Sequence, residues 1–266
     1  MDEFRDFLLV DRQLRERTVY NHVREIERLL GCMGSDSMSL GRGDLRSYLG
    51  GFQGRPANTY SNVLKSLKVF FRDFLGRPEL VASFRFPHVP VKPKILSFTT
   101  EDLRVFYDEL GDSLAEGLFL VYATSGLRRN EVLGLRGRNV DSGLRMIVPE
   151  GSSRTKSTYV TFYNEEASEL LKEIIPVDSG ARIFPVTENY FRKRYIRIRA
   201  KTGIHVTPQM LREWFCSEMG RLGVPDRYVD AFCGRVPASV LAKHYTDFSP
   251  ENLKEIYDKA SLKVLS

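Results

Sequence analysis

Apolar positions recur at helical spacing through the first ninety residues of the chain. One stripe consists of Val19, Val23, Ile26 and Leu30. It predicts a helix with Thr18 as its N-cap, because a threonine hydroxyl can accept a hydrogen bond from the first turn. A short helix is expected near residues 44–52, and a longer one from about Asn58 to Leu75. The apolar face of the longer helix consists of Tyr60, Val63, Leu64, Leu67, Phe70, Phe71 and Phe74.

The helical pattern stops between residues 84 and 100, where the sequence FRFPHVPVKPKILSFTT has three prolines and no periodicity. Proline fixes its own φ angle and biases the preceding residue towards extended structure, so this segment is expected to be a linker. We place the linker at residues 89–98. It separates a helical domain at residues 1–88 from a second domain at residues 99–266.

The second domain is predicted to be mostly helical. Thr99 or Thr100 can cap its first helix, and residues 114–124 are almost wholly apolar, which indicates a buried helix. Residues 146–163 alternate in polarity around a Gly/Ser turn, a pattern typical of a β-hairpin. The expected fold is therefore mainly α, with a small β-hairpin or sheet in the second of two domains.

The composition excludes several classes of protein. The chain has 266 residues, of which 42% are hydrophobic and 28% charged, so it is neither a disordered chain nor a disulfide-rich miniprotein. It lacks the run of about 18 apolar residues that a membrane span needs, and its start is too charged for a signal peptide. Three widely spaced cysteines show no metal-ligand spacing. We expect a cytoplasmic protein with no membrane partner, no metal and no cofactor.

Basic residues are concentrated in two segments of a chain whose net charge is +6. Residues 42–95 carry ten Lys or Arg against three acidic residues, and residues 189–201 carry six basic residues and no acidic one. Such clusters attract nucleic acids because each neutralised phosphate releases counterions, although an ordinary solvated surface gives the same pattern. The candidate nucleic-acid contacts are Lys65, Lys68, Arg72, Lys92, Lys94, Arg192, Lys193 and Arg194.

Three short motifs could carry chemistry. In TSGLRRNEVLGL (124–135), Arg128 and Glu131 are three positions apart on a helix, where a carboxylate can orient a guanidinium towards a phosphate or form an ordinary ion pair. In TPQMLR (207–212), Thr207 is a plausible N-cap for a helix that bears Arg212. In CGRVPASVLAKHYTDF (233–248), Tyr245 is either a half-buried core aromatic or a phenol nucleophile.

The order and separation of these motifs resemble the tyrosine recombinases of the phage integrase family. The wording GRVPASVLAKHY looks most like integrases of archaeal plasmids and viruses. The resemblance covers nearly the whole chain. Residues 1 to about 88 look like the helical core-binding domain of that family, and residues from about 96 to 266 look like its catalytic domain.

The resemblance implies a role for each matched residue. Arg128 and Arg212 match the two arginines that bind the scissile phosphate, and Glu131 matches the acid that orients the first of them. Lys156 matches the hairpin lysine that protonates the leaving 5′ oxygen. Tyr245 matches the nucleophile, which forms a 3′-phosphotyrosine without a metal or cofactor.

Two positions depart from the family pattern. The common H-x-x-R motif reads Q-M-L-R here, so Gln209 stands where an imidazole is expected, and Arg235 stands where a later His or Trp is expected. Glutamine and arginine donate hydrogen bonds but do not exchange protons near neutral pH. His205 and His244 are near in sequence and are candidates to replace the missing histidine.

The resemblance implies a site-specific recombinase that binds double-stranded DNA and assembles into a tetramer on it. Residues 250–265 predict a last helix, which packs either on its own domain or on a neighbouring protomer. Two other functions stay open at this point. One is relaxation of DNA by a type IB topoisomerase-like enzyme, and the other is a DNA-binding protein whose catalytic site has decayed at Gln209 and Arg235.

Overall fold

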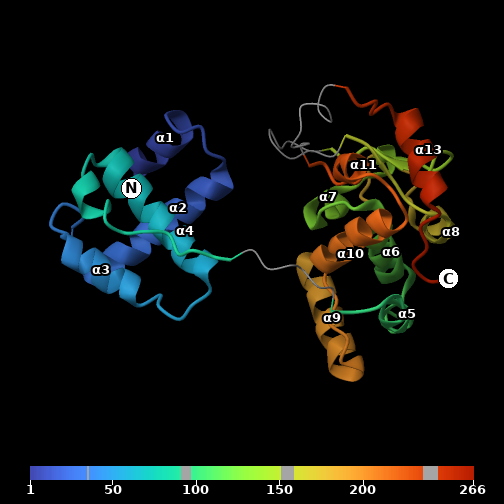
Figure 1. Cartoon of the computed structure of the whole chain (residues 1–266), viewed down its shortest axis with the longest axis horizontal. Helices are drawn as coiled ribbons and strands as arrows, with labels where there is room; N and C mark the ends of the chain where they lie inside the picture. Colours follow the sequence, from blue (N-terminus) through green and yellow to red (C-terminus); the bar gives the residue numbers. More distant parts are fainter. Residues whose placement is uncertain (35, 91–96, 151–158, 236–244) are drawn as a thin grey trace. The chain divides into compact units, whose positions relative to one another are not determined.

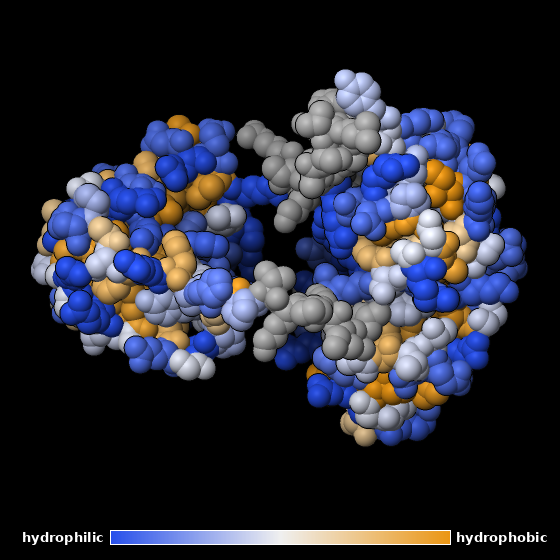
Figure 2. All heavy atoms as spheres, viewed as in Figure 1, coloured by the Kyte–Doolittle hydropathy of each residue, from blue (hydrophilic) through white to orange (hydrophobic). Residues whose placement is uncertain are grey.

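The computed structural model describes residues 1–34, 36–90, 97–150, 159–235 and 245–266. The chain forms two compact units, Met1–Pro93 and Lys94–Ser266, each with a hydrophobic core of its own (Figure 1). On the face drawn in Figure 2, hydrophilic side chains predominate on each unit, and smaller apolar areas are interspersed among these side chains.

The first unit is wholly helical in the residues described. Its elements are α1 (Asp2–Val10), α2 (Glu16–Met33), α3 (Arg42–Gly50), α4 (Ala57–Leu67), the π-helix η1 (Lys68–Phe74) and the 3-10 helix η2 (Pro78–Leu80). The N-cap prediction for α2 is wrong. The helix begins at Glu16 with Arg15 as its N-cap, so Thr18 lies inside the first turn, where its N–H donates to the Arg15 carbonyl.

The long helix expected from Asn58 to Leu75 is present as α4 followed directly by η1. Its predicted apolar face is confirmed, because the residues on it are buried or packed against the core. The ring of Phe70 meets that of Phe4 edge-on, with centroids 4.9 Å apart, and Phe71 is fully buried beside it. This aromatic contact packs α1, the first helix of the unit, against η1.

The second unit combines helices with a small sheet. Its helices are α5 (Thr100–Asp108), α6 (Ser113–Ser125), α7 (Arg129–Gly134), η3 (Gly137–Asn139), α8 (Glu165–Ile174), α9 (Glu188–Thr202), α10 (Pro208–Arg221), α11 (Asp226–Phe232) and α13 (Pro250–Ala260). Its strands are β1 (Val140–Asp141), β2 (Met146–Ile147) and β3 (Thr161–Phe162). The mainly helical fold with a small sheet is as the sequence predicts.

Helix α6 is the centre of the second unit. It is apolar on every side, which is typical of a fully buried helix, and it packs against α8 and α10. The Asp112 side chain caps its N-terminus by accepting a hydrogen bond from the Ala115 N–H at 2.9 Å. At its other end, the buried hydroxyl of Ser125 donates to the carbonyl of Val121, so this buried hydroxyl has a partner. The apolar helix predicted at residues 114–124 is confirmed.

The three strands form an antiparallel sheet in the order β1-β2-β3. Val140 pairs with Ile147, and Ile147 pairs with Thr161. The predicted hairpin at residues 146–163 is confirmed by the pairing of β2 with β3, while the turn at residues 151–158 lies outside the described residues. Strand β1 was not predicted, because Val140–Asp141 lies outside the alternating segment at residues 146–163.

The C-terminal segment packs on its own unit. Helix α13 ends at Ala260, earlier than expected, and the buried Tyr257 hydroxyl donates to the Thr124 carbonyl at 2.8 Å. Beyond the helix, Val264 is buried and its N–H donates to the Glu166 carboxylate at 2.8 Å. Of the two alternatives for this segment, the structure shows packing within the chain.

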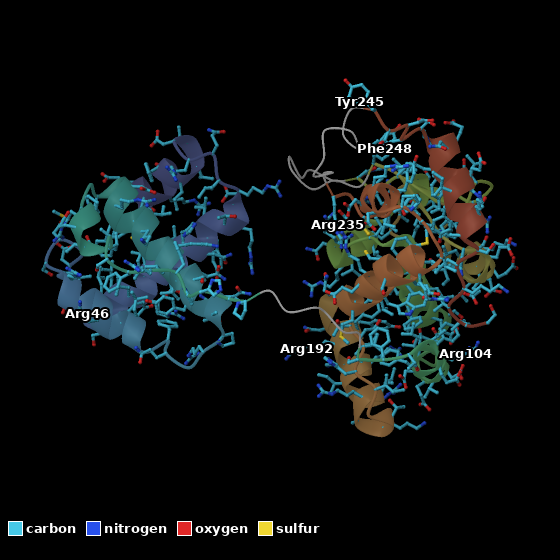
Figure 3. All side chains as sticks on the ribbon, in the orientation of Figure 1. Arg46, Arg104, Arg192, Arg235, Tyr245 and Phe248 are labelled. Carbon is cyan, nitrogen blue, oxygen red and sulfur yellow. The ribbon has the colours of Figure 1, made fainter. Side chains whose placement is uncertain are left out.

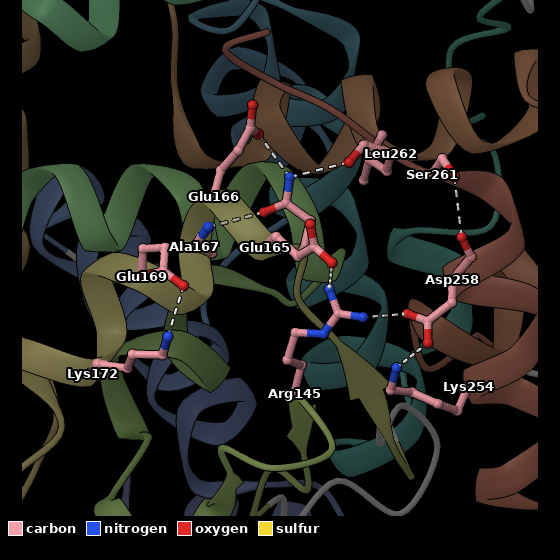
Figure 4. A network of polar contacts seen from close by, with 11 residues as sticks. Arg145, Glu165, Glu166, Ala167, Glu169, Lys172, Lys254, Asp258, Ser261 and Leu262 are labelled. Atoms are coloured by element: carbon pink, nitrogen blue, oxygen red, sulfur yellow. Dashed lines mark hydrogen bonds and ion pairs between the residues drawn. The ribbon is translucent and has the colours of Figure 1, made fainter.

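Two ion pairs of Arg145 hold α13 against the sheet and α8, as Figure 4 shows. Arg145 contacts Asp258 of α13 at 2.9 Å and Glu165 of α8 at 3.5 Å. Because the Tyr163 N–H donates to the Arg145 carbonyl at 3.1 Å, the backbone of this residue is tied to the strand segment as well. The C-terminal helix is therefore fixed to the same elements that support α6.

Gly126, which ends α6, tests how tightly this unit is packed. Its φ angle is +66°, and a Cβ there would lie 2.6 Å from Phe215 Cε1. We expect Gly126→Ala to lower the free energy of unfolding in urea by about 3 kcal/mol, through left-handed backbone strain plus overpacking.

The control is Gly111→Ala, because Gly111 has a φ angle of +77° but no atom within 4 Å of a Cβ. It should lose only about 1–2 kcal/mol, from the backbone conformation alone. Equal losses in the two variants would contradict the tight packing of Gly126 against α10.

Candidate active site

Arg128 stands at the N-cap of α7, directly after the turn that ends α6. Glu131 closes a capping box on it: one carboxylate oxygen accepts from the Arg128 N–H at 2.7 Å, and the other accepts from the guanidinium Nη1 at 2.9 Å. The second amino group, Nη2, donates to the Gly234 carbonyl at 3.1 Å. The guanidinium is thus fixed at two points, and the Arg128 side chain stays partly exposed.

Arg212 lies in the first half of α10, whose start is fixed by local signals. As predicted, Thr207 is the N-cap, and its hydroxyl accepts a hydrogen bond from the Met210 N–H; Pro208 occupies the first helical position. The Arg212 side chain is almost fully buried, at 4% exposure. Its guanidinium donates to the carbonyl of Gly126 through Nη1 and to that of Cys233, at 2.7 Å, through Nη2.

Burial lowers the pKa of Arg212, and its neighbours Arg128 and Arg235 lower it further by charge repulsion. A guanidinium nevertheless stays protonated in proteins. Both of its acceptors are neutral main-chain carbonyls, and no carboxylate among the described residues balances its charge. This arrangement favours the approach of an anion.

Arg235 completes a cluster of three arginines around residues 233–235. Its Nη1 donates to the Asp230 carboxylate at 3.2 Å, and its backbone N–H donates to the Asp230 carbonyl at 2.9 Å. The carbonyls of Cys233 and Gly234, which follow α11, bind Arg212 and Arg128 respectively. We call Arg128, Arg212 and Arg235 the arginine cluster.

Two cysteine thiols lie beside the arginine cluster. Cys216 Sγ and Cys233 Sγ are 3.3 Å apart, and Arg235 Nη2 is 3.5 Å from Cys216 Sγ. The hydrogen bond from Cys233 and the charges of Arg235 and Arg212 outweigh burial and lower the pKa of Cys216 to about 7. The same hydrogen bond, together with burial, raises the pKa of Cys233.

Tyr245 stands apart from the arginine cluster in this structure. Its ring is 78% exposed, and Figure 3 shows it projecting from the edge of the unit, away from Arg235. The interpretation of Tyr245 as a half-buried core aromatic is therefore wrong. Nearby, the ring of Phe248 packs edge-on to that of Tyr228, with the ring centroids 6.1 Å apart.

Comparison with known proteins places the chain in a family. Residues 98–252 match the Phage integrase family. The chain belongs to this family. It is 29% identical over 224 residues to the tyrosine recombinase XerA of Thermococcus onnurineus, with 76% of this chain and 77% of the relative covered. It is also 25% identical over 289 residues to XerC of Xylella fastidiosa strain M23, with 98% and 96% covered.

Solved integrase structures have the same fold as this phage integrase family member. A lambda integrase dimer bound to a COC′ core site matches with a TM-score of 0.67 at 15% identity, covering 94% of each chain. A lambda integrase tetramer bound to a Holliday junction matches with a TM-score of 0.68 at 14% identity, covering 92% of this chain and 76% of that one. The family and the fold confirm the prediction of a tyrosine recombinase.

Four other predicted site residues are either exposed or outside the described residues. The Gln209 side chain is exposed and donates to Glu213, one turn further along α10, at 2.9 Å. His205 is exposed before the start of α10. Lys156 and His244 lie outside the described residues. The roles of these four residues stay predictions.

The basic residues predicted to contact DNA divide into two groups in the second unit. Arg192 and Lys193 are exposed on α9, where Figure 3 labels Arg192. Arg194 is engaged within the unit: it forms an ion pair with Asp112 and donates to the Leu110 carbonyl at 3.0 Å. Arg192 and Lys193 are therefore better placed than Arg194 to meet a ligand.

In the first unit, Lys65 lines a polar groove between α2 and α4 that also contains Arg24 and Arg28. Lys68 Nζ lies 5.5 Å from the centre of the Phe86 ring, and Arg72 binds Asp73 at 2.6 Å. Lys92 and Lys94 lie outside the described residues. Arg24 and Arg28 are two further candidates that were not predicted from the sequence. They become candidates only because α2 packs beside α4, which places them in the same groove as Lys65.

Sequence reasoning also missed the groups that hold the arginine cluster. They are the carbonyls of Gly126, Cys233 and Gly234, and the side chains of Asp230 and Cys216. A carbonyl carries no signal in the sequence, since every residue has one. Asp230 could have been suspected from its position five residues before Arg235.

Neither a metal site nor a membrane span is found in the parts described. No group of three or more His, Cys, Asp or Glu side chains in the described ranges could hold a metal ion. Of the helices searched there, none has the length and apolar character needed to cross a membrane.

The arrangement around Cys216 can be tested by alkylation. A thiolate is the reactive form of cysteine, so the rate at which iodoacetamide modifies native Cys216 should be half-maximal near pH 7. In unfolded protein the midpoint should rise to about 8.5. Mass spectrometry of the tryptic peptide 213–221 gives both rates.

Arg235→Gln should move the native midpoint to higher pH, because the nearby positive charge is lost. Equal midpoints in the native and unfolded protein would show that Cys216 does not share its environment with the arginine cluster.

Proposed function

We propose that this protein cuts and rejoins DNA strands at a specific site through a covalent 3′-phosphotyrosine at Tyr245. The observation that carries this proposal is the convergence of Arg128 and Arg212 on neighbouring carbonyls. Residues that are far apart in the chain present two guanidinium groups to one place, held by the carbonyls of Gly234 and Cys233.

Arg128 and Arg212 would bind the two non-bridging oxygens of the scissile phosphate. A phosphodiester repels nucleophiles by its negative charge, and its pentacoordinate transition state carries more charge still. Guanidinium groups that are already in position stabilise that charge without reorganising, which is usually the largest contribution to catalysis. Glu131 fixes the direction of Arg128, and the two carbonyls fix that of Arg212.

Arg235 would add a third positive charge where related enzymes commonly have a His or Trp. Asp230 holds it in place at 3.2 Å. Gln209 would donate a hydrogen bond to the same phosphate after releasing Glu213, which it contacts at 2.9 Å. Neither residue exchanges protons near neutral pH, so this site would rely on charge rather than on acid–base chemistry at these two positions.

In the reaction, the Tyr245 hydroxyl gives up its proton to the solvent as its oxygen attacks the phosphorus, and the bond to the 5′ oxygen breaks. Lys156 gives its proton to the leaving oxygen, so that a free 5′-hydroxyl is formed. The phosphotyrosine link conserves the energy of the broken bond, so the reverse attack by another strand's 5′-hydroxyl needs neither ATP nor a metal. The exposed position of Tyr245 lets its hydroxyl meet a phosphate held by arginines of its own chain or of a second copy.

The two units would bind DNA together. The first unit, with the groove that contains Lys65, would serve as the core-binding domain, and the second as the catalytic domain. Exchange of strands requires two cleaved duplexes, so a tetramer on DNA is expected. Similar solved structures include an integrase dimer on a core site and an integrase tetramer on a Holliday junction. Action on DNA would place the protein in the cytoplasm, associated with the nucleoid.

A protein that only binds DNA is less well supported by the site. Such a protein has no need to fix two guanidinium groups beside each other, since holding like charges together is costly. Arg212 is nevertheless held in place by two carbonyls, next to a second fixed arginine. The relaxation of DNA by a topoisomerase-like enzyme is likewise less well supported, because the relatives are recombinases by name.

The role of Tyr245 can be tested on a nicked duplex from which the cleaved end diffuses away. Tyr245→Phe should bind this DNA as tightly as the wild type and form no covalent protein–DNA adduct, because the attacking oxygen is absent. Gel electrophoresis under denaturing conditions detects the adduct.

Tyr159→Phe is the matched control, because Tyr159 is also exposed, at 67%, in the same unit. It should form the adduct in normal yield. A normal adduct yield from Tyr245→Phe would remove Tyr245 as the nucleophile.

The roles of Lys156 and Arg128 can be separated by the leaving group. Lys156→Ala should slow cleavage of ordinary DNA by about 10²–10⁴-fold, the usual contribution of a general acid. Sulfur in place of the bridging 5′ oxygen should restore most of this rate, because a thiolate leaves without a proton.

Arg128→Lys should lose about 10²–10³-fold on both substrates, since it removes a fixed hydrogen-bond donor rather than a proton. The measurement is the rate of adduct formation. If sulfur rescues both variants equally, Lys156 does not act as the general acid.

A further inference from the structure

Two thiols lie beside the arginine cluster, and neither of them takes part in the proposed reaction. Cys216 is one helical turn after Arg212 on α10, and Cys233 is the C-cap of α11. Their sulfur atoms are 3.3 Å apart although 17 positions separate them in the chain. A disulfide bond measures about 2.05 Å, so the pair is reduced here and close to bonding distance.

The two thiols differ in their access to solvent. Cys216 is partly exposed, whereas Cys233 is fully buried. The hydrogen bond from Cys233 and the guanidinium of Arg235, 3.5 Å from Cys216 Sγ, stabilise negative charge on the Cys216 sulfur. The Cys216 pKa of about 7 leaves much of this thiol as thiolate at neutral pH. A partly exposed thiolate next to a second thiol is the arrangement found at oxidation-sensitive sites.

We propose that Cys216 and Cys233 form an oxidation site that takes a peroxide as its oxidant and closes to an intramolecular disulfide, which disables the arginine cluster. The formation of the disulfide is independent of the proposed recombinase activity. Only its effect on DNA cleavage rests on that function.

The chemistry balances with hydrogen peroxide alone. The Cys216 thiolate attacks one oxygen of the peroxide, the O–O bond breaks, and the departing hydroxide takes up a proton to leave as water. The product is a sulfenic acid on Cys216. The Cys233 sulfur then attacks the Cys216 sulfur, the S–O bond breaks, and the hydroxyl leaves with the Cys233 proton as a second water. Two thiols are oxidised and one peroxide is reduced.

Bond formation would disturb the arginines because Cys233 supplies one of their anchors. The sulfur atoms must approach by about 1.3 Å from their present 3.3 Å. A Cβ placed on Gly126 would lie 2.9 Å from Cys233 Sγ, so this sulfur is packed closely against the turn and has little room to move alone.

Movement of Cys233 would therefore reach its carbonyl, which binds Arg212, and the next carbonyl, which binds Arg128. Misplacement of catalytic groups by about 1 Å can lower a rate by on the order of 10²-fold. We expect a loss of that size in covalent adduct formation.

The experiment uses the full chain in a Cys32→Ser background, which removes the exposed third thiol on α2 and so prevents links between chains. The protein is treated with hydrogen peroxide, and one half is then reduced with dithiothreitol. Trypsin releases Cys216 in peptide 213–221 and Cys233 in peptide 228–235, so mass spectrometry detects a disulfide as a linked pair of peptides. Adduct formation on nicked DNA is measured on the same samples.

The expected result is a linked peptide pair that is two hydrogen atoms lighter than its parts, with slowed adduct formation that dithiothreitol restores. A Cys32→Ser, Cys216→Ser protein should form no linked pair, and its own rate should be the same before and after peroxide. Free peptides after a treatment that oxidises Cys32 in the wild-type chain would overturn the proposal, as would linked peptides with unchanged adduct formation.

If the untreated protein forms no adduct at all, the recombinase proposal fails. The linked peptides still decide whether the oxidation site exists, so the two failures can be told apart.

Discussion

The buried guanidinium of Arg212 is the constraint on which the second unit depends. Taking a charged group out of water is costly unless its donors are bound, and this one is bound by the carbonyls of Gly126 and Cys233. Gly126 and Cys233 are the C-caps of α6 and α11, while the arginine itself belongs to α10. One side chain thus joins three helix segments through the backbone groups that helix ends leave without partners.

The same constraint explains why the positive charges stay available to a ligand. Carboxylates of Glu131 and Asp230 hold Arg128 and Arg235 in position. Arg212 is held by neutral carbonyls instead, so its direction is fixed without a carboxylate among the described residues to balance its charge. Burial, and then repulsion by the other two guanidinium groups, lowers the pKa of Arg212, which makes an anion such as a phosphate a stabilising partner. Like charges held close together lower the stability of the fold, and such clusters are typical of sites that bind a charged ligand.

Much of the fold could be predicted from the sequence because its signals are local. Thr99 and Thr207 accept hydrogen bonds from residues three positions later, and the buried helix α6 is apolar on all sides. The start of α2 was missed because its N-cap residue is Arg15, whose side chain makes no capping hydrogen bond, so the sequence carries no capping signal there. Strand β1 was missed because it lies outside the alternating segment that predicted β2 and β3.

The candidate site was only partly predictable for a related reason. Arg128, Glu131 and Arg212 could be found from their motifs, but the three carbonyls that hold the two arginines lie 21, 86 and 106 positions away from the arginines they bind. The thiol pair under Arg235 likewise depends on the packing of α10 against α11. The exposure of Tyr245 could not be read from apolar spacing, which had indicated a core position.

Cleavage through Tyr245 requires that Arg128 and Arg212 bind a single phosphate that Tyr245 can attack. The most direct measurement is the structure of the Tyr245→Phe protein bound to its uncleaved DNA site. It should show both guanidinium groups at about 2.7–2.9 Å from oxygens of the same backbone phosphate, with the ring of residue 245 facing its phosphorus. A complex in which every phosphate lies away from this pair, with Arg212 still bound only to Gly126 and Cys233, would contradict it.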